Sequence, residues 1–569
     1  MANITRSQFV KGAAVGTAAV AAGAIAAPAL ADEAAITAET VSGKWAFEIA
    51  PDPIADDQIS EVKEAEVIVV GAGTAGLCCA VSAAEAGAKV ILFAMGSGPI
   101  GRGGSMFAFH SKFRESWGLE PVNPDPYLKA QMIQNQWNFD TDKWFKWAKY
   151  SEEAMNWLSD IMTEAGDCTP TLEQVQHGNC QDPNALEYTP IATHGWIRED
   201  IPSVGAGDGQ PFVVANLAIK AEELGVELIY NMTAKQLVRG GVPNGTEGRV
   251  DAVIAQDKEG NYVKFVGSKA IVLATGDFAR DKDMMMKYCP GAWHYFTNYD
   301  KGDDFDPEAG KVYGGLYKGD GQKMGLWVGA AWQKTFPNAT MGGGFFSGAD
   351  TIGMLLNSDG KRFAPEPQNF GQCFMLFPHV HKKWVFQIWD SDYAVNAAPW
   401  PKSKTAYGSE LSTPEEKIAG WDATVERGFT PEMGGMVKAD TIEEVIEKLG
   451  LPPETIDEVN KYNGFCDAGL DEDFHKNPLY LIPIKTPPFY GYAGIPRNIM
   501  HTVLGGLRTD INCKVCDAND EPIPGLYNVG SMIGDSYAGW YSFCIPGQNY
   551  GMNCVCYGYL TGKYIAENE

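Results

Sequence analysis

The sequence has few basic residues for its size. Lys and Arg together number 45 against 72 Asp and Glu, so the formal net charge is −27. Because an acidic surface repels phosphate groups, this balance argues against binding to nucleic acid or to an anionic membrane surface. Internal repeats and low-complexity tracts are not evident either. With 45% hydrophobic and 21% charged residues, the composition is that of a soluble globular protein.

The cysteine spacings of common haem and metal sites are also missing. Among 12 cysteines the close pairs are Cys513-x-x-Cys516 and Cys554-x-Cys556. No C-x-x-C-H is present, which excludes covalent c-type haem, and the iron–sulfur spacings are absent too. We therefore expect core or loop thiols rather than a cluster or a redox pair. No metal site is predicted.

The N-terminal segment is predicted to be an export signal. Arg6 and Lys11 precede an Ala/Gly-rich apolar stretch, and Ala29-Leu30-Ala31 has the pattern of a signal cleavage site. The stretch is too weakly apolar for a membrane anchor, so no stable membrane insertion is expected after cleavage. Thr5–Lys11 resembles a twin-arginine signal with Ser7 in place of the second arginine. We expect an exported protein in the periplasm or on the outer face of the cell membrane.

The most informative stretch is Val67–Phe93, which reads VIVVGAGTAGLCCAVSAAEAGAKVILF. Its apolar start predicts a buried strand, and G-x-G-x-x-G follows at once. Gly71 permits the tight turn, Gly73 lets the backbone approach a pyrophosphate, and Gly76 lets the next helix pack closely on the sheet. The pattern predicts a dinucleotide-binding βαβ unit.

The helix of this unit ends at Gly87, and Lys89–Phe93 forms its second strand. Because a helix N-terminus has free N–H groups and a positive dipole end, Thr74 and Ala75 are predicted to bind a phosphate. The second strand usually ends in an acidic residue that binds a ribose. Here that position holds Phe93 or Ala94, so the ribose contact must come from elsewhere.

A chain of 569 residues is too long for one ordinary core, which favours two domains. The predicted class is α/β, a Rossmann-like cofactor domain interrupted by an α+β capping domain. We expect one helical region over Tyr127–Ala165 and a hairpin formed by Val250–Asp257 and Tyr262–Lys269. The predicted divisions are an export signal at 1–31, a linker at 32–61, the cofactor domain at 62–340, the capping domain at 341–484 and the second part of the cofactor domain at 485–569.

Several motifs along the chain point to one family. They are VIVVGAGTAGL at its start, KAIVLATGDF at 269–278, GDGQKMGLWVGAA at 319–331, NSDGKRFAPE at 357–366, HTVLGGLRTD at 501–510 and IPGLYNVGSMIG at 523–534. With these motifs, nearly all of the mature chain resembles the flavoprotein family of fumarate reductases, urocanate reductases and 3-ketosteroid dehydrogenases. The resemblance implies FAD, bound covalently or not. It also implies two-electron transfer between the flavin N5 and a carbon–carbon bond.

The resemblance further implies which residues form the site. Cofactor contacts carry over to Gly71, Gly73, Thr74, Ala75, Gly76, Gly103, Gly104, Ser105, Thr275, Gly276, Asp320, Gly530 and Gly547. His501 matches the histidine that binds substrate in fumarate reductases. The other reading of His501 is a core histidine bonded to a backbone carbonyl.

The arginines of fumarate reductases do not carry over. No arginine lies between Arg362 and Arg427, and the second arginine motif is replaced by a stretch from Tyr537 to Gln548 without arginine. A dicarboxylate needs bidentate cationic partners, so the sequence argues against fumarate as the substrate.

Aromatic residues stand in the same regions. Tyr393, Tyr537, Trp540 and Tyr541 are predicted to line a pocket for a flat, less charged molecule. Steroid dehydrogenases of this superfamily use tyrosines in proton transfer, which makes Tyr393 the candidate acid. His501 and Tyr541 are the candidate groups that stabilise a developing enolate. For any one of these tyrosines, packing of the cap is the alternative role.

Three functions remain open. The first is an exported reductase, suited to anaerobic respiration, for an enone or aryl-conjugated alkene. It would take electrons from a cytochrome or a quinol-linked protein, since no haem site is encoded. The second is a ketosteroid-type dehydrogenase that runs in the desaturating direction. The third is a flavin-carrying binding or electron-transfer protein.

Overall fold

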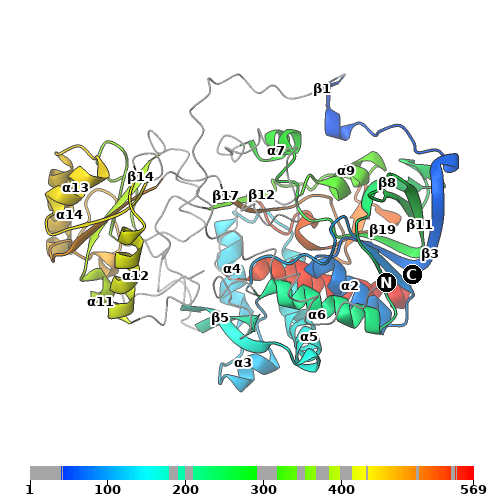
Figure 1. Ribbon diagram of the computed structural model, residues 1–569, viewed down its shortest axis with the longest axis horizontal. Coiled ribbons are helices and arrows are strands. Elements are labelled where there is room, and N and C mark those ends of the chain that lie inside the picture. Colours follow the sequence, from blue (N-terminus) through cyan, green and yellow to red (C-terminus); the bar gives the residue numbers. More distant parts are fainter. Residues whose placement is uncertain are drawn as a thin grey trace.

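A computed structural model gives the structure of the chain. It describes residues 40–41, 43–104, 106–177, 190–198, 209–290, 317–342, 353–366, 384–396, 413–430, 434–494, 499–539, 545 and 547–569. Two units with separate cores are visible in Figure 1, the larger one around a mixed sheet and the smaller one at the left. No helix in these ranges is both long and apolar enough to span a membrane. The predicted export signal lies outside them.

The larger unit is built on a sheet of nine strands among the described residues. Its parallel part runs β7 (Glu227–Ile229), β4 (Val90–Phe93), β3 (Ile59–Val70), β11 (Tyr262–Leu273) and β19 (Pro522–Asn528). The apolar run predicted as a buried strand is the last part of β3. The second strand of the βαβ unit is β4, as predicted.

On the side away from β3, the first half of β11 has a different neighbour from its second half. It pairs antiparallel with β10 (Val250–Gln256), which confirms the predicted hairpin. Strands β8 (Thr233–Arg239) and β9 (Val242–Pro243) continue this antiparallel side, and β18 (Lys514–Cys516) pairs with β19. Only the second half of β11, which lies between the parallel strands β3 and β19, therefore ends at a ligand edge of parallel strands.

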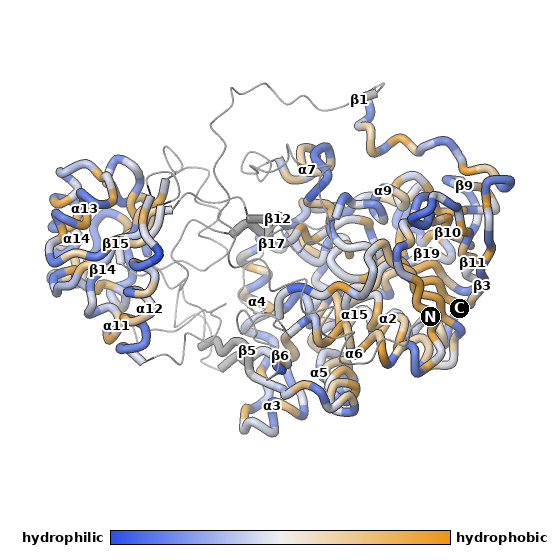
Figure 2. Tube along the Cα trace, viewed as in Figure 1, coloured by the Kyte–Doolittle hydropathy of each residue, from blue (hydrophilic) through white to orange (hydrophobic). Residues whose placement is uncertain are grey.

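Both faces of the parallel sheet are buried, because its strands are continuously apolar. Val67 and Val69 belong to the core under the helices, and Ile68 and Val70 belong to the core on the opposite face. The central strands form the strongly hydrophobic band at the right of Figure 2. The helices of the first core are α2 (Thr74–Glu85), α5 (Thr141–Ala165), α6 (Gln210–Glu223) and α15 (Tyr557–Asn568).

The region predicted to be helical over Tyr127–Ala165 consists of two helices. Helix α4 (Pro124–Gln134) ends before Gln136 and Trp137, whose φ angles of 53° and 60° are left-handed, and α5 begins at Thr141. No glycine or proline marks this break in the sequence. Smaller elements in the same half of the unit are α3 (Lys112–Ser116) and the paired strands β5 (Thr169–His177) and β6 (Pro190–Ile197).

The smaller unit, the cap, has a four-stranded antiparallel sheet. Its order is β13 (Met354–Leu356), β14 (Val385–Asp390), β16 (Phe489–Gly494) and β15 (Gly435–Ala439). Its helices are α11 (Tyr393–Asn396), α12 (Pro414–Glu426), α13 (Ile442–Leu449) and α14 (Thr455–Ala468). The strands that flank the insertion, β12 (Asn338–Gly342) and β17 (Ile499–Leu504), pair with each other.

Two predicted boundaries need correction. Strand β16 lies in the cap sheet, so the cap extends beyond the boundary predicted at 484. The residues after 43, predicted as a linker, pack on the larger unit: Phe47 is buried, and the indole of Trp327 donates to its carbonyl oxygen at 2.9 Å. The close cysteine pairs are free, buried thiols at Cys513, Cys516, Cys554 and Cys556.

Candidate cofactor and substrate site

The carboxyl ends of four parallel strands meet at one edge of the sheet. Val70 pairs with Phe93 and with Leu273, and Leu273 pairs with Asn528. In open α/β sheets, ligands bind beyond this edge. The turns that follow these strands contain five of the thirteen predicted cofactor residues: Gly71, Gly73, Thr275, Gly276 and Gly530.

The glycine turn after β3 has the geometry that its sequence predicts. Gly71 has a φ of +118°, and a Cβ there would lie 2.3 Å from the carbonyl oxygen of Ala274. A Cβ at Gly76 would lie 2.1 Å from the Gly71 oxygen, so α2 packs directly on the turn. Among the described residues, a Cβ at Gly73 would meet only the Ile100 oxygen, at 3.8 Å. The backbone at Gly73 therefore borders open space at the N-terminus of α2, which fits a pyrophosphate.

A buried glutamine joins this turn to the second glycine loop. Gln210, at the start of α6, accepts a hydrogen bond from the Thr74 hydroxyl at 2.7 Å and donates to the Gly104 oxygen at 2.8 Å. Its backbone N–H donates to the Gly103 oxygen at 3.0 Å. The Thr74 side chain is thus used within the protein, so only its backbone N–H could serve as the predicted phosphate contact. Sequence analysis missed Gln210, because its partners lie more than a hundred positions away.

Helix α9 (Asp320–Trp327) begins at the same edge. The Gly321 N–H donates to the Thr275 hydroxyl at 3.2 Å, and the Gln322 amide donates to the Gly276 oxygen at 2.9 Å. A Cβ at Gly321 would lie 2.2 Å from the Thr275 hydroxyl, so the close approach requires glycine. Asp320, the first residue of α9, is half-buried beside these contacts. The structure therefore brings three predicted residues, Thr275, Gly276 and Asp320, into one corner.

Gln548 is a fully buried amide at the start of the π-helix η10 (Asn549–Cys556). Neither its nitrogen nor its oxygen has a hydrogen-bond partner within the described ranges. A buried amide without partners is costly, so Gln548 fits a ligand that offers both a donor and an acceptor. Its neighbour Gly547, with φ +67°, accepts a hydrogen bond from the Phe107 N–H at 3.2 Å.

A buried carboxylate connects the cofactor edge to β17. Asp277 follows Gly276 and is 4% exposed. The Thr502 hydroxyl and the Val503 N–H lie 3.4 Å from its Oδ2. Burial raises the pKa of Asp277, and the positive charge of Arg102 acts in the opposite direction. This contact holds the strand that carries His501 against the cofactor edge.

Several predicted side chains lie outside the described part of the chain. Ser105, Trp540 and Tyr541 are not among the described residues. For His501 the structure gives only the backbone, in β17. Their roles stay predictions.

The two remaining candidate tyrosines are buried in different cores. The Tyr537 ring packs edge-on against Trp144, with centroids 5.5 Å apart, in the core of the larger unit. Tyr393 is 1% exposed in the core of the cap, and its hydroxyl donates to the Ile482 oxygen at 2.8 Å. Burial raises the pKa of Tyr393 well above its usual value. The predicted role of Tyr393 as the acid stays untested, and this geometry argues against it.

Arg362 is also part of the cap core. Its guanidinium binds the carboxylates of Glu366 and Asp471 at 2.8 and 2.9 Å, and all three side chains are buried. Arg362 therefore neutralises the cap's own acids.

A family model described as FAD binding domain matches residues 66–544. The chain belongs to this family. It is therefore an oxidoreductase with FAD as its cofactor, as the resemblance predicted, and the open backbone at Gly73 fits that cofactor.

Individual relatives and structures agree with this flavoprotein assignment. The vinyl phenol reductase of Lactiplantibacillus plantarum is 26% identical over 88% of this chain and 94% of its own length. The urocanate reductase of Eggerthella lenta is 25% identical over 83% of this chain and 70% of its own length. A 3-ketosteroid-Δ4-(5α)-dehydrogenase from Rhodococcus jostii has a TM-score of 0.65, at 23% identity over 90% of this chain and 99% of that chain. The last comparison confirms the predicted fold.

Proposed function

We propose that this flavoprotein reduces a carbon–carbon double bond conjugated to an aromatic ring or a carbonyl group, with electrons from a separate donor. The observation that carries the proposal is the chemistry of the two positions where fumarate reductases place arginine. No arginine lies in 363–426, and Gln548, a buried neutral amide, stands near the second position. A dicarboxylate bound there would have no bidentate cation, whereas a conjugated alkene needs none.

The name of one relative supports the same class of substrate. Vinyl phenol reductase, which matches over 94% of its own length, is named for an alkene conjugated to a phenol. Two aromatic residues predicted at the site, Trp540 and Tyr541, suit a flat substrate of this kind.

The reduction adds a hydride to one alkene carbon and a proton to the other. When bound, FAD supplies the two-electron chemistry at its N5. The protein must supply the proton, together with hydrogen bonds to the charge that develops on the conjugated group. We assign these tasks to His501 and Tyr541, since the Tyr393 hydroxyl donates within the cap core.

An anaerobic stopped-flow experiment tests this function. The enzyme is reduced with one equivalent of dithionite and mixed with 4-vinylphenol, a cyclic enone, urocanate or fumarate, while flavin reoxidation is recorded. We expect the vinylphenol or the enone to reoxidise the flavin fastest. His501→Ala should slow the reaction with FAD content unchanged. Fumarate reacting as fast as the best conjugated alkene would contradict the proposal.

A second assay, started from the oxidised enzyme, separates the other two functions. Oxidation of a 3-ketosteroid with a dye as electron acceptor would indicate a dehydrogenase. Rapid electron exchange with dyes, but no reaction with any alkene or steroid, would indicate an electron carrier.

Export by the twin-arginine route is part of the same proposal. It is supported by Arg6, the apolar stretch and Ala29-Leu30-Ala31, and by the need of a flavoprotein to bind its cofactor before export. Arg6→Gln should leave the FAD-loaded protein in the cytoplasmic fraction. Lys11→Gln should reduce export less than Arg6→Gln does. Export of Arg6→Gln at the normal level would contradict the route.

A further inference from the structure

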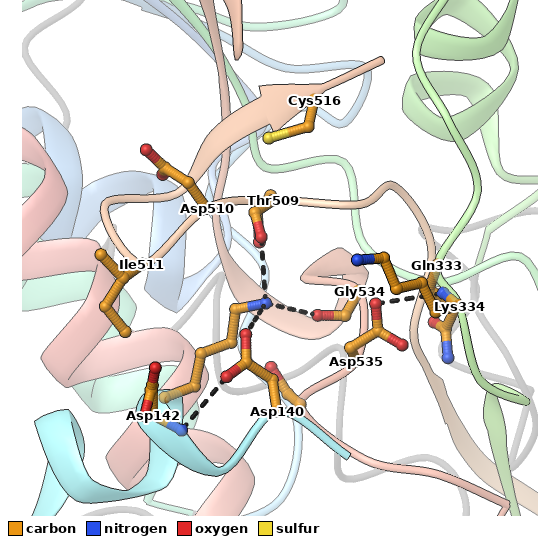
Figure 3. Close-up of polar contacts among 12 residues, drawn as sticks. Asp140, Asp142, Gln333, Lys334, Thr509, Asp510, Ile511, Cys516, Gly534 and Asp535 are labelled. Carbon is orange, nitrogen blue, oxygen red and sulfur yellow. Dashed lines mark hydrogen bonds and ion pairs between the residues drawn. The ribbon is translucent and has the colours of Figure 1, made fainter. Parts of the chain in front are cut away.

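The first turn of α5 binds successive carbonyl groups of a segment near the cofactor edge. The Asp140 N–H donates to the Asp535 oxygen at 2.8 Å. The Lys143 ammonium donates to the Gly534 oxygen at 2.9 Å. In Figure 3, Asp140, Thr509 and Gly534 converge on one point from three parts of the chain.

The next residue of the helix completes the pattern. The Trp144 indole donates to the Ser536 oxygen at 2.7 Å. Its ring also packs edge-on against the Tyr537 ring, with centroids 5.5 Å apart. Three consecutive carbonyl groups and the following aromatic ring are thus held by one helical turn.

Lys143 is the central residue of this turn. Its side chain is 1% exposed, and its ammonium also lies 3.3 Å from the Thr509 oxygen and 3.0 Å from the Asp140 carboxylate. A buried ammonium needs such partners, so all three of its donors are used inside the protein. Thr509 belongs to the chain that continues from β17, so Lys143 joins that chain to the Gly534 segment.

The backbone of the segment is held in an unfavourable conformation. Asp535 has a φ of +61°, which costs energy in a residue other than glycine. Its carboxylate accepts hydrogen bonds from the N–H groups of Lys334 and Thr335, at 3.1 and 2.9 Å. The segment is therefore fixed from two sides, by α5 and by the chain that leads to β12.

We propose that Lys143 is a positioning residue for the substrate, acting through the segment Gly534–Tyr537. The inference rests on the proposed function, because the predicted substrate residues Tyr537 and Tyr541 lie in or just after this segment. Lys143 has no described contact with the cofactor residues at Gly73 or Gln210. Its loss should therefore weaken substrate turnover and leave FAD binding intact.

The test compares Lys143→Met with a matched control one turn along the helix. Lys146 donates to the Ile511 oxygen at 2.7 Å and to the Asn512 side chain at 3.1 Å, away from the segment. Lys146→Met therefore removes a similar lysine with no contact to Gly534–Tyr537. Lys143→Arg keeps the charge and serves as the rescue variant.

Two measurements are made on the FAD-loaded proteins. Hydrogen exchange of peptides covering 534–539 reports on the contact itself and needs no substrate. Steady-state kinetics with the best alkene separates kcat from KM. Lys143→Met should exchange faster over 534–539 and lose about tenfold or more in kcat/KM. Lys146→Met should match the wild type in both, and Lys143→Arg should regain part of the loss.

Each outcome decides one question. Unchanged exchange in Lys143→Met, or faster exchange with unchanged kcat/KM, would overturn the positioning role. If Lys143→Met does not fold, Trp144→Phe decides, since it removes one donor and keeps the ring; wild-type kcat/KM in that variant would overturn the role. A wild type that reduces no alkene refutes the proposed function instead, and the exchange result still stands.

Discussion

His194 is a fully buried histidine whose two ring nitrogens are both used. Nε2 lies 2.6 Å from the Ser111 hydroxyl, and Nδ1 lies 3.2 Å from the Met106 oxygen, next to the second glycine loop. Burial, with a smaller contribution from Arg114, lowers the pKa of His194 to about 4. The imidazole is therefore neutral in the folded protein.

The lowered pKa of His194 predicts that the folded protein loses stability at acid pH. Because the folded pKa is depressed, the stabilising contribution is complete above the unfolded value near 6.5 and is lost as pH falls toward 4. The free energy of unfolding should fall by up to about 3 kcal/mol in this window from His194 alone. In His194→Asn the free energy of unfolding, measured by urea unfolding at a series of pH values, should fall less steeply as the pH is lowered. His110→Asn, at a partly exposed histidine, is the control, and an equal slope in wild type and His194→Asn would contradict the assignment.

The sequence and the structure predict different roles for Tyr393. As a general acid it would contribute roughly 10²–10⁴-fold to turnover. As a buried core residue that donates to Ile482, its hydroxyl contributes about 1 kcal/mol to the stability of the cap. We therefore expect Tyr393→Phe to lower the unfolding temperature slightly and to change kcat by less than about threefold. A loss of a hundredfold at full FAD content would restore the catalytic role.

At the scale of elements, the N-terminus of α6 forms hydrogen bonds with both glycine loops of the cofactor site. Gln210 joins the Thr74 hydroxyl to the Gly104 oxygen. Gln210→Leu would leave both groups without this partner, which costs about 1–3 kcal/mol. We expect roughly tenfold weaker FAD binding, measured by titrating the apoprotein with FAD. Asn216→Leu is the control, since Asn216 is a buried amide of the same helix that donates to Asp167 instead. Equal affinity in the two variants would contradict the role of Gln210.

The elements that sequence analysis predicted correctly depend on local signals. The apolar run at Val67–Val70, the glycine turn and the hairpin from Val250 each lie within a short window. The contacts of Gln210 and Lys143 were missed because each joins residues far apart in sequence. The boundary of the cap was placed too early because an apolar strand pattern such as Phe489–Gly494 does not say which sheet the strand joins.

At the scale of the whole molecule, the two units have separate hydrophobic cores. The core of the cap consists of residues between Met354 and Ala493, and the cores around the large sheet take their residues from other parts of the chain. The cap core also contains the buried ion pairs of Arg362 with Glu366 and Asp471. The predicted FAD residues that the structure describes all belong to the larger unit. Units with separate cores can unfold in separate steps.

We therefore predict two thermal transitions for the apoprotein, with different responses to FAD and to mutation. FAD at a hundred times its Kd should stabilise the larger unit by about 2.7 kcal/mol and leave the transition of the cap in place. Arg362→Met should do the reverse, because removing the cation from buried carboxylates costs about 3–5 kcal/mol. Lys361→Met is the control, since its pair with Glu458 has a half-exposed lysine and contributes at most about 1 kcal/mol. Calorimetry with and without FAD measures both transitions. A single transition that moves with both FAD and Arg362→Met would mean that the cap and the larger unit unfold as one cooperative body.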